Sequence, residues 1–158
     1  MSLLKKGSKA PGFSLLNQDG VKVQLEDFRG RYLVLYFYPK ALTPGCTTQA
    51  CSIRDVKREL NDAGAEVMGI SPDSVVKLKK FCDKHQLNFD LLADEEHIVA
   101  DTYGVWGLKK FMGKEFMGVI RTTFIIDPKG NIAEILDKFS TSSHHQTVLD
   151  WFAAKESG

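Results

Sequence analysis

The sequence predicts an α/β fold in which helices cover both faces of a mixed central sheet. Residues 32–38 are apolar at odd and even positions alike, which is typical of a central strand buried on both faces. Strand-like and helix-like patterns alternate through the middle of the chain, and the C-terminal part has the pattern of a hairpin followed by a helix. This order of elements predicts a sheet with both parallel and antiparallel strands.

An N-terminal β-hairpin is expected before the central strand. Residues 13–16 and 21–25 have strand-like composition, and the Asn17-Gln18-Asp19-Gly20 segment between them is typical of a turn. The central strand then stops at Pro39, because proline cannot donate to a strand ladder.

A helix is expected soon after the central strand. Thr43 is a suitable N-cap, Pro44 suits the first helical position, and Gly64 is a stop signal. The apolar residues at helical spacing between these ends are Ile53, Val56 and Leu60.

The other elements follow from the same patterns. Residues 67–70 predict a strand, and the helix after it opens at Ser71-Pro72-Asp73. The apolar stripe of that helix consists of Val75, Leu78, Phe81 and Cys82. We further expect a short strand at 91–92, a helix from 94 to about 103, a loop at 104–118, a hairpin of strands 119–126 and 132–136, and a final helix from 142 to about 155.

Length and charge limit the classes of function. A chain of 158 residues fits one domain, which we expect to span residues 1–158. Its 21 basic and 20 acidic residues nearly balance, so charge does not favour binding to nucleic acid or to an anionic membrane. The opening residues lack the apolar core of a signal peptide, and no later run could span a bilayer. We expect a cytoplasmic protein.

The cysteine pattern argues against a structural disulfide framework and against a metal site. There are three cysteines, an odd number, in a chain that we expect to stay in a reducing compartment. The sequence has no Cys-x-x-Cys or His-x-x-x-His spacing that would complete a zinc site. We expect reduced thiols at rest, no metal and no cofactor.

Cys46 is the candidate nucleophile. With Thr43 as N-cap, Cys46 lies in the first helical turn, where unpaired backbone N–H groups and the helix dipole favour a thiolate. The thiolate is the nucleophilic form of cysteine. A lone cysteine at such a position would more often be a small packing residue. Two further residues, Cys51 and Arg121, favour the chemical interpretation.

The spacing of Cys46 and Cys51 excludes a disulfide within an intact helix. Five residues of α-helix separate the two Cα atoms by roughly 8–9 Å, whereas a disulfide needs them within about 7 Å. Oxidation of this pair would require the helix to unwind locally, which suits a reversible catalytic bond better than a structural one.

Arg121 lies in the apolar segment 119–126, where a buried guanidinium would need an anionic partner. A thiolate is one such partner. An arginine on an edge strand that reaches water or pairs with one of the acidic residues fits the strand equally well.

The segment Pro39-Lys40-Ala41-Leu42-Thr43-Pro44-Gly45-Cys46 resembles the peroxiredoxin signature P-x-x-x-T-x-x-C, in the form found in the bacterioferritin comigratory protein, or Q, subfamily. The resemblance covers nearly the whole chain. Further matching segments are Asp94-Glu95, Tyr103-Gly104-Val105-Trp106-Gly107, Phe111-Met112-Gly113-Lys114 and Arg121-Thr122-Thr123-Phe124-Ile125-Ile126-Asp127.

The resemblance implies a thioredoxin-like fold and a thiol-dependent peroxidase that reduces hydrogen peroxide and organic hydroperoxides. Cys46 would be the peroxidatic cysteine, with Pro39 shielding it and with Thr43 and Arg121 orienting the peroxide. The backbone N–H groups near Gly45 and Cys46 would add donors. Cys46 would become a sulfenic acid, a second thiol would form a disulfide with it, and thioredoxin or a glutaredoxin-type protein would reduce that bond.

Two cysteines are candidates for the resolving role. In the subfamily that this chain resembles, the resolving cysteine lies either five residues along the same helix or on the following helix, and this chain has a cysteine at both places. Cys51 lies five residues along the same helix, and Cys82 lies on the following helix. Cys82 falls on the apolar stripe of its helix, where a core-packing thiol is the simpler explanation. We favour Cys51 on the spacing of the cysteines.

Two further properties follow from the subfamily and from the residues. A monomer is expected, with a weak dimer as the alternative because the apolar Phe111 and Met112 fall in an expected loop. The alternative function is a thioredoxin-fold redox-sensing or binding module without peroxidase turnover. A disulfide oxidoreductase is disfavoured because four residues separate Cys46 from Cys51, where that chemistry normally has two.

Overall fold

The structure is a computed structural model that describes residues 4–157. Residues 1–3 and 158 lie outside the described part, and with them the first residues on which the signal-peptide expectation rests. The strands are β1 (Ser14–Asn17), β2 (Lys22–Gln24), β3 (Tyr32–Phe37), β4 (Ala65–Ser71), β5 (Asp90–Ala93), β6 (Trp106–Phe111), β7 (Lys114–Val119), β8 (Thr122–Ile126) and β9 (Ile132–Leu136). The helices are the 3₁₀-helix η1 (Leu25–Phe28) and the α-helices α1 (Pro44–Asp55), α2 (Lys57–Asp62), α3 (Val75–His85), α4 (Ile98–Thr102) and α5 (His144–Ser157).

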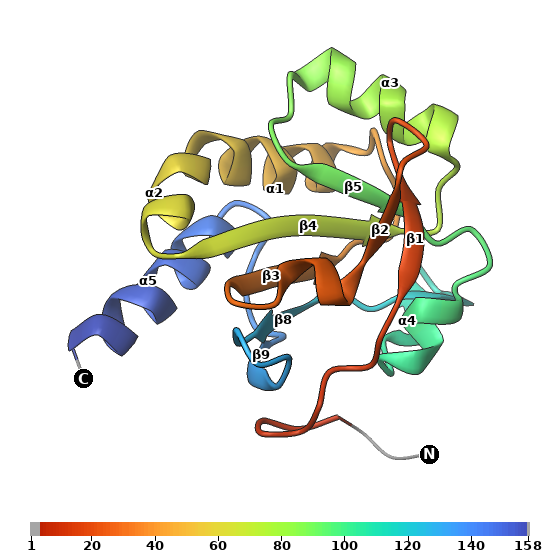
Figure 1. The fold of residues 1–158 in the computed structure, drawn as a ribbon. Helices are drawn as coiled ribbons and strands as arrows, with labels where there is room; N and C mark the ends of the chain where they lie inside the picture. Colours follow the sequence, from red (N-terminus) through yellow and green to blue (C-terminus); the bar gives the residue numbers. More distant parts are fainter. Residues whose placement is uncertain (1–3, 158) are drawn as a thin grey trace.

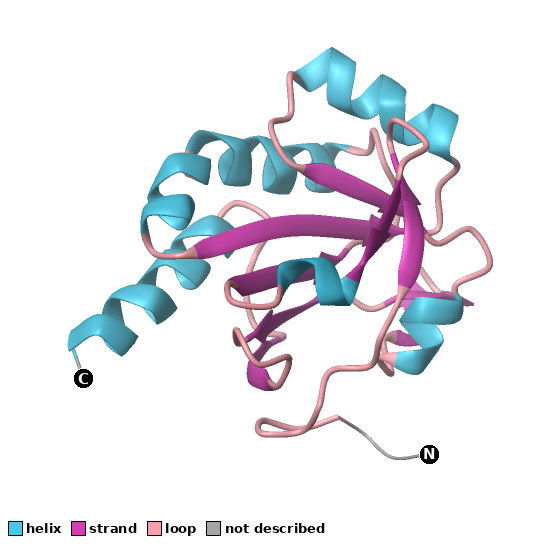
Figure 2. Ribbon diagram, in the orientation of Figure 1, coloured by secondary structure: helices cyan, strands magenta, loops and turns pink. Residues whose placement is uncertain are grey.

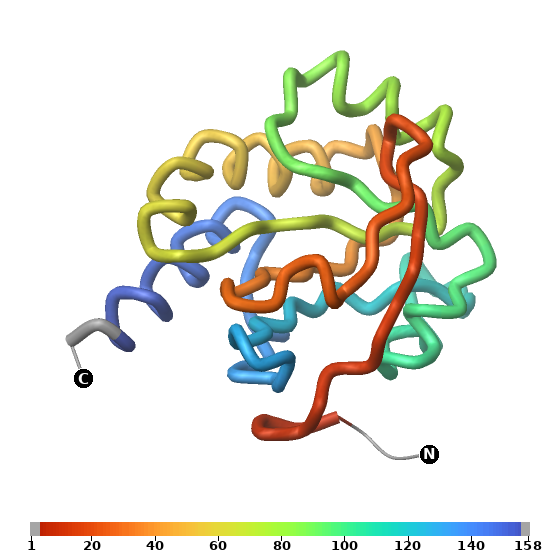
Figure 3. The backbone as a smooth tube through the Cα atoms, viewed as in Figure 1, coloured from red at the N-terminus to blue at the C-terminus, as the bar shows by residue number. Residues whose placement is uncertain are grey.

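Seven strands form one mixed sheet in the order β2-β1-β5-β4-β3-β8-β9. The neighbours β3, β4 and β5 are parallel, and β8 and β9 extend the sheet antiparallel beyond β3 (Figure 1). The trace in Figure 3 follows the chain from β3 through α1 and α2 to β4, and from β4 through α3 to β5. Such helical crossovers are what parallel neighbours require. The N-terminal hairpin β1–β2 joins the sheet through an antiparallel pair with β5.

Helices cover both faces of the sheet, as the sequence predicts (Figure 2). On one face, side chains of α1, α2, α3 and α5 pack on Val34 and Tyr36 of β3. On the other face, α4 and the N-terminal segment pack on Leu33, Leu35 and Phe37 of the same strand. All six residues of β3 are apolar because alternate side chains enter two different cores.

The helix predicted between Thr43 and Gly64 is two helices. Val56 leaves helical geometry, with φ −112° and ψ 12°, and separates α1 from α2. The helix expected from Ser71 begins at Val75, because Ser74 is its N-cap and accepts a hydrogen bond from the backbone N–H of Lys77.

The helix expected from Asp94 is also shorter than predicted. It begins at Ile98, and Asp94 lies before it as a buried side chain that accepts hydrogen bonds from the backbone N–H groups of Val99 and Ala100. The acid therefore stabilises this helix from outside its first turn.

The prediction of a loop at residues 104–118 is wrong. This segment contains β6 and β7, which pair with each other and not with the main sheet. Met112 and Gly113 form the two-residue turn, and both have positive φ, 51° and 79°. Such turns usually carry Asn-Gly or Asp-Gly, so Met-Gly gives a weak hairpin signal. The exposed apolar side chains Phe111 and Met112 therefore lie at a hairpin tip.

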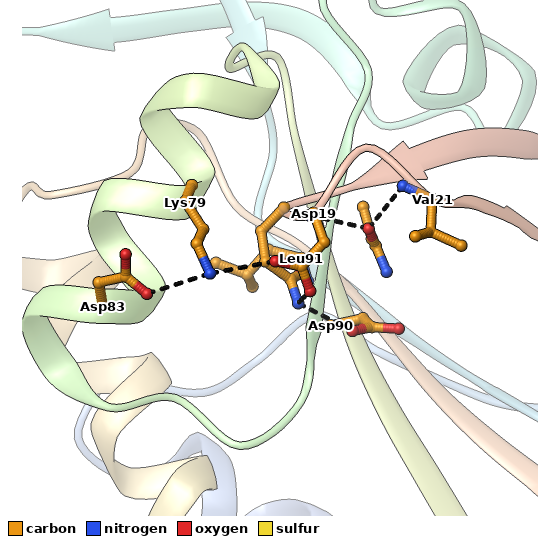
Figure 4. A network of polar contacts seen from close by, with 8 residues as sticks. Asp19, Val21, Lys79, Asp83, Asp90 and Leu91 are labelled. Carbon is orange, nitrogen blue, oxygen red and sulfur yellow. Dashed lines mark hydrogen bonds and ion pairs between the residues drawn. The ribbon is translucent and has the colours of Figure 1, made fainter.

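The turn of the N-terminal hairpin is tied to α3 (Figure 4). Nζ of Lys79 lies 3.1 Å from a carboxylate oxygen of Asp19 and 3.4 Å from one of Asp83. The side chain of Gln18 accepts a hydrogen bond from Leu91 N–H and donates one to Asp90, both at 3.0 Å. These contacts link the hairpin, α3 and β5 at one edge of the fold.

Gly69 makes room for two tyrosine rings, so we expect Gly69→Ala to destabilise the protein. A Cβ atom there would lie 2.9 Å from Cζ of Tyr36, 2.9 Å from Cε1 of Tyr38 and 3.0 Å from Leu91. Overpacking of this kind costs about 1–3 kcal/mol. Urea unfolding checks the loss, and Gly12→Ala is the matched control because nothing lies within 4 Å of its Cβ position. Equal free energies of unfolding for the two variants would contradict the prediction.

None of the helices within residues 4–157 has the length and apolar composition needed to cross a membrane.

Candidate active site

The site is built at the N-terminus of α1, directly after the central strand. Thr43 occupies the N-cap position with extended backbone, Pro44 is the first helical residue, and Cys46 is the third. Backbone N–H groups in this first turn have no partner within the helix, and the helix dipole places partial positive charge there. Cys46 is only 1% exposed, so its sulfur is surrounded by protein at this positive end.

Arg121 contacts the sulfur of Cys46. Its Nη2 donates to Sγ at 3.1 Å, and its Nη1 donates to Oε1 of Gln49 at 2.7 Å. Arg121 is half-buried and lies between β7 and β8, so the expectation that it sits inside a strand is wrong. The sequence left open whether Arg121 pairs with a thiolate or instead reaches water or an acidic residue. In the structure it contacts the sulfur of Cys46. A guanidinium at this distance stabilises a negative charge on sulfur.

Gln49 holds the guanidinium in a fixed orientation. It lies one helical turn after Cys46 in α1 and is fully buried. Because Arg121 reaches Cys46 and Gln49 through two different nitrogens, the planar fork cannot rotate without breaking one bond. In the sequence, only the position of Gln49 three residues after Cys46 indicates that it could lie near the site. A helix residue that faces solvent could occupy the same position, so the sequence does not distinguish the two.

Gly45 allows the guanidinium to approach the helix. A Cβ atom at this position would lie 3.3 Å from Nη2 of Arg121 and 3.6 Å from Cγ2 of Thr141. Any larger residue would therefore push Arg121 away from the first turn of α1. Thr141, on the segment before α5, was not predicted as a neighbour of the site.

The structure places Thr43 and Pro39 on the loop between β3 and α1. The hydroxyl of Thr43 donates to the carbonyl of Lys40 at 2.8 Å. Thr43 thus has the N-cap position that the sequence predicts, but its side chain does not accept the capping hydrogen bond. Its hydroxyl closes the loop in this state, and its oxygen keeps a lone pair for another donor.

Lys109 adds a second cation that the sequence did not indicate. Its Nζ donates to the carbonyl of Val119 at 2.9 Å. Burial lowers the pKa of Lys109, the positive charge of Arg121 lowers it further, and Cys46 opposes the shift. Lys109 therefore interacts electrostatically with Arg121 and Cys46 from β6. The sequence pattern predicts a loop at this position.

His144 lies at the start of α5, as expected, and behind the site. It is fully buried, and its Nε2 lies 2.7 Å from the hydroxyl of Thr123. Burial lowers the pKa of His144 to about 3, with smaller contributions from the charges of His145 and Arg121. His144 is therefore neutral near pH 7 and adds no positive charge beside Arg121.

The other two cysteines occupy different environments. Cys51 is half-buried on α1, in the same continuous helix as Cys46, and Cys82 is buried on α3. Burial, with help from Asp83 and other acids, raises the pKa of Cys82 to about 12. All three cysteines are free thiols in the structure. Within the described residues, no cluster of three His, Cys, Asp or Glu side chains could hold a metal ion.

The arrangement provides a nucleophile with fixed donors around it. A sulfur at a helix N-terminus, paired with a guanidinium and largely enclosed, has the features of an activated cysteine. The remaining N–H groups of Arg121 and of the first turn of α1 can stabilise negative charge that develops near the sulfur.

The profile of the AhpC/TSA family matches residues 6–135. Among curated proteins, peroxiredoxin Bcp of Escherichia coli (strain K12) is 53% identical over 151 residues, which cover 96% of this chain and 97% of that protein. Peroxiredoxin Bcp of Bacillus subtilis (strain 168) is 47% identical over 143 residues, 90% of this chain and 91% of that protein.

Solved structures with the same fold include a cysteine-to-serine variant of PrxQ from Xylella fastidiosa, with a TM-score of 0.92, 28% identity and 99% coverage of both chains. Bacterioferritin comigratory protein of Xanthomonas campestris, described for its alkyl peroxide reduction activity, has a TM-score of 0.86 and 29% identity, and covers 98% of this chain and 99% of its own.

Proposed function

Because the chain belongs to the AhpC/TSA family and is a peroxiredoxin, a thiol-dependent peroxidase with a thioredoxin-like fold, we propose that Cys46 is the sulfur that attacks the hydroperoxide. The 3.1 Å contact between Arg121 Nη2 and Cys46 Sγ carries this assignment, since a cation at that distance favours the thiolate. Neither Cys51 nor Cys82 has a hydrogen-bonded guanidinium among the described contacts.

In the first step the Cys46 thiolate attacks one oxygen of the hydroperoxide in line with the O–O bond. An S–O bond forms, the O–O bond breaks, and the departing oxygen leaves as water or an alcohol after it takes up a proton. The sulfur is oxidised by two electrons to a sulfenic acid. Negative charge moves from sulfur to the departing oxygen, so donors must reach both oxygens. We assign this task to Arg121, to the hydroxyl of Thr43 and to the backbone N–H groups of Gly45 and Cys46.

Pro39 and Gly45 shape the surroundings of the attack. Pro39 ends the strand ladder before the loop, and we assign to it the shielding of Cys46 from bulk water. Gly45 leaves space for the guanidinium of Arg121 beside the first turn of α1. Pro39 acts through its rigid ring and Gly45 through its lack of a side chain, so neither role depends on side-chain charge.

In the second step we propose that Cys51 resolves the sulfenic acid. Its sulfur attacks Cys46 Sγ, the S–S bond forms, the S–O bond breaks, and water leaves. Both residues lie in the intact helix α1, where the Cα atoms of residues five apart are roughly 8–9 Å from each other. Part of α1 must therefore unwind before the bond can form, because a disulfide needs Cα atoms within about 7 Å.

Cys82 is the second candidate for resolution. Two solved structures of peroxiredoxin Q from Xanthomonas campestris, each 32% identical to this chain, carry cysteine-to-serine substitutions at positions as far apart as Cys46 and Cys82. Against Cys82, its buried position raises its pKa to about 12, so its thiolate is scarce before α3 moves. Cys51 is half-buried and needs only α1 to open.

Mapping of the disulfide tests the cysteine assignments directly. After one equivalent of hydrogen peroxide, we expect a Cys46–Cys51 bond with Cys82 free, identified by peptide mass spectrometry. Cys51→Ser should still form the sulfenic acid but lose thioredoxin-coupled turnover by about tenfold or more, because the resolving thiol is missing. Cys82→Ser is the matched control and should keep turnover within about twofold. A Cys46–Cys82 bond with Cys51 free would reverse the choice, and a bond without Cys46 would refute the assignment of the nucleophile.

We propose thioredoxin, or a glutaredoxin-type dithiol protein, as the reductant that restores both thiols. One thiolate of the dithiol attacks the protein disulfide and forms a mixed disulfide with one cysteine, which releases the other cysteine as a thiol. The second thiolate of the dithiol then displaces the remaining cysteine, so the dithiol leaves as its own disulfide and both cysteines are reduced. Such dithiols are kept reduced in the cytoplasm, where we propose that the protein works.

A further inference from the structure

Asp73 is a buried carboxylate that the peroxide chemistry described above does not use. It lies on the loop between β4 and α3 and is 6% exposed. Its Oδ2 accepts a hydrogen bond from the backbone N–H of Ala41 at 2.8 Å and another from the hydroxyl of Ser71 at 2.7 Å. Its Oδ1 lies 3.4 Å from Nζ of Lys77. A carboxylate this deeply buried is stable only because these partners replace water.

The hydrogen bond to Ala41 joins Asp73 to the loop that precedes Cys46. The two loops follow β4 and β3, which are parallel neighbours, so both leave the sheet at the same edge. The last sheet contact before the loop is the hydrogen bond from Tyr38 N–H to the carbonyl of Ile70, at 3.0 Å. Asp73 supplies the next fixed point, three residues further along the chain.

The loop needs such a fixed point because its backbone is strained. Leu42, between Ala41 and Thr43, has φ +67°, a left-handed conformation that non-glycine residues rarely adopt. Ala41 is 1% exposed, so its N–H group could not find water if the carboxylate were removed. A hydrogen bond to an ionised carboxylate is stronger than one between neutral groups, and here it can offset the cost of the Leu42 conformation.

We propose that Asp73 is a positioning residue for the peroxidase reaction, which acts through Ala41 to hold Thr43 and the first turn of α1 where they meet the peroxide. This role rests on the proposed function of Cys46. Without the Ala41–Asp73 bond, Leu42 can relax to a right-handed or extended conformation, and Thr43 then moves relative to Cys46. Reactions that depend on oriented donors lose about 100-fold for displacements near 1 Å.

The role of Asp73 in the loop can be separated from its contact with α3. Lys77 lies on α3 and touches only Oδ1, whereas Ala41 and Ser71 bind Oδ2. Lys77→Met therefore removes the ion pair and keeps the loop bond. Asp83→Ala is a further control, because Asp83 is an exposed acid on α3 whose partner is Lys79 (Figure 4).

The test compares two reactions of Cys46 in full-length protein that also carries Cys51→Ser and Cys82→Ser, so that Cys46 is its sole thiol. The rate constant with hydrogen peroxide reports the oriented displacement, and the rate constant with iodoacetamide reports the thiolate alone. Asp73→Ala should lower the peroxide rate by about 100-fold and leave the iodoacetamide rate within about threefold. Asp73→Asn, which keeps one acceptor oxygen for Ala41, should lose less and stay within about tenfold of the parent. Lys77→Met and Asp83→Ala should match the parent.

Several results would overturn the proposal. Peroxide rates of both Asp73 variants within twofold of the parent would do so, and so would equal losses in the two reactions, which indicate general damage to the fold. If circular dichroism shows that Asp73→Ala does not fold, Asp73→Asn decides: a loss confined to peroxide supports the role, and an unchanged peroxide rate refutes it. If the parent itself forms no sulfenic acid at Cys46, the proposed function fails and the role of Asp73 falls with it.

Discussion

Cys46→Ser is expected to abolish peroxide consumption, with a fall in the rate constant of at least about four orders of magnitude. Serine has nearly the same size, and its hydroxyl can still accept the hydrogen bond from Arg121. It is not ionised near neutral pH and is a far weaker nucleophile than a thiolate. The loss should therefore occur without a change of fold.

The measurement is the consumption of hydrogen peroxide with thioredoxin and its reductase, together with thermal unfolding of each variant. Cys82→Ser, which also replaces a buried thiol by a hydroxyl, is the matched control and should remain active. Turnover by Cys46→Ser at more than about 1% of the parent rate would show that another residue attacks the peroxide.

Arg121→Ala should lower the rate constant with hydrogen peroxide by about 100- to 1000-fold, the usual effect of removing a donor that stabilises charge in the transition state. The change removes both the contact with Cys46 Sγ and the hydrogen bond to Gln49. Arg121→Lys keeps a positive charge but loses the planar fork, so we expect an intermediate loss of about tenfold.

Stopped-flow measurement of the first turnover separates this effect from the later disulfide step. Arg31→Ala is the matched control, because Arg31 is an exposed residue that pairs with Glu66 on the surface. If Arg121→Ala reacts within about threefold of the parent, the guanidinium is a structural neighbour of the sulfur and not part of the reaction.

The sequence predicted the parts of the fold that local patterns determine. The central strand β3 is apolar at every position because both of its faces are buried, and this pattern needs no knowledge of the rest of the chain. The position of Cys46 in the first turn of α1 also follows from neighbours in sequence, namely Thr43 as N-cap and Pro44 as first helical residue.

The hairpin β6–β7 could not be predicted in the same way. Most of its side chains face solvent on either side, among them Leu108, Phe116 and Met117, which are about half exposed. Apolar and polar residues therefore do not alternate along either strand, as they do along a strand with one buried face. Among the described strands, β6 and β7 pair with each other in a separate two-stranded sheet, so the main sheet imposes no hydrophobic pattern on them.

The site shows the same division between local and distant information. Gln49 and Arg121 are 72 residues apart in sequence, and only the folded chain brings Nη1 within 2.7 Å of Oε1. Asp73 was visible in the sequence only as part of a helix start. Its contact with Ala41 depends on the adjacent ends of β3 and β4, which a single sequence does not reveal.

The stability of the N-terminal end of α1 affects the two steps of the proposed cycle in opposite ways. After Pro44, which suits the first helical position, the residues Gly45-Cys46-Thr47-Thr48 are poor helix formers, so packing and not intrinsic propensity maintains this end of the helix. The contact between Arg121 and Cys46 needs the helix intact, whereas a bond to Cys51 needs it open.

A mutation that strengthens α1 would therefore favour attack on the first peroxide and delay the disulfide. During that delay the sulfenic acid can meet a second peroxide and become a sulfinic acid, which thiols do not reverse. In the proposed cycle, the weak helix start thus limits how long the sulfenic acid is exposed to further peroxide, and we expect a variant with a more stable α1 to be inactivated sooner at high peroxide concentration.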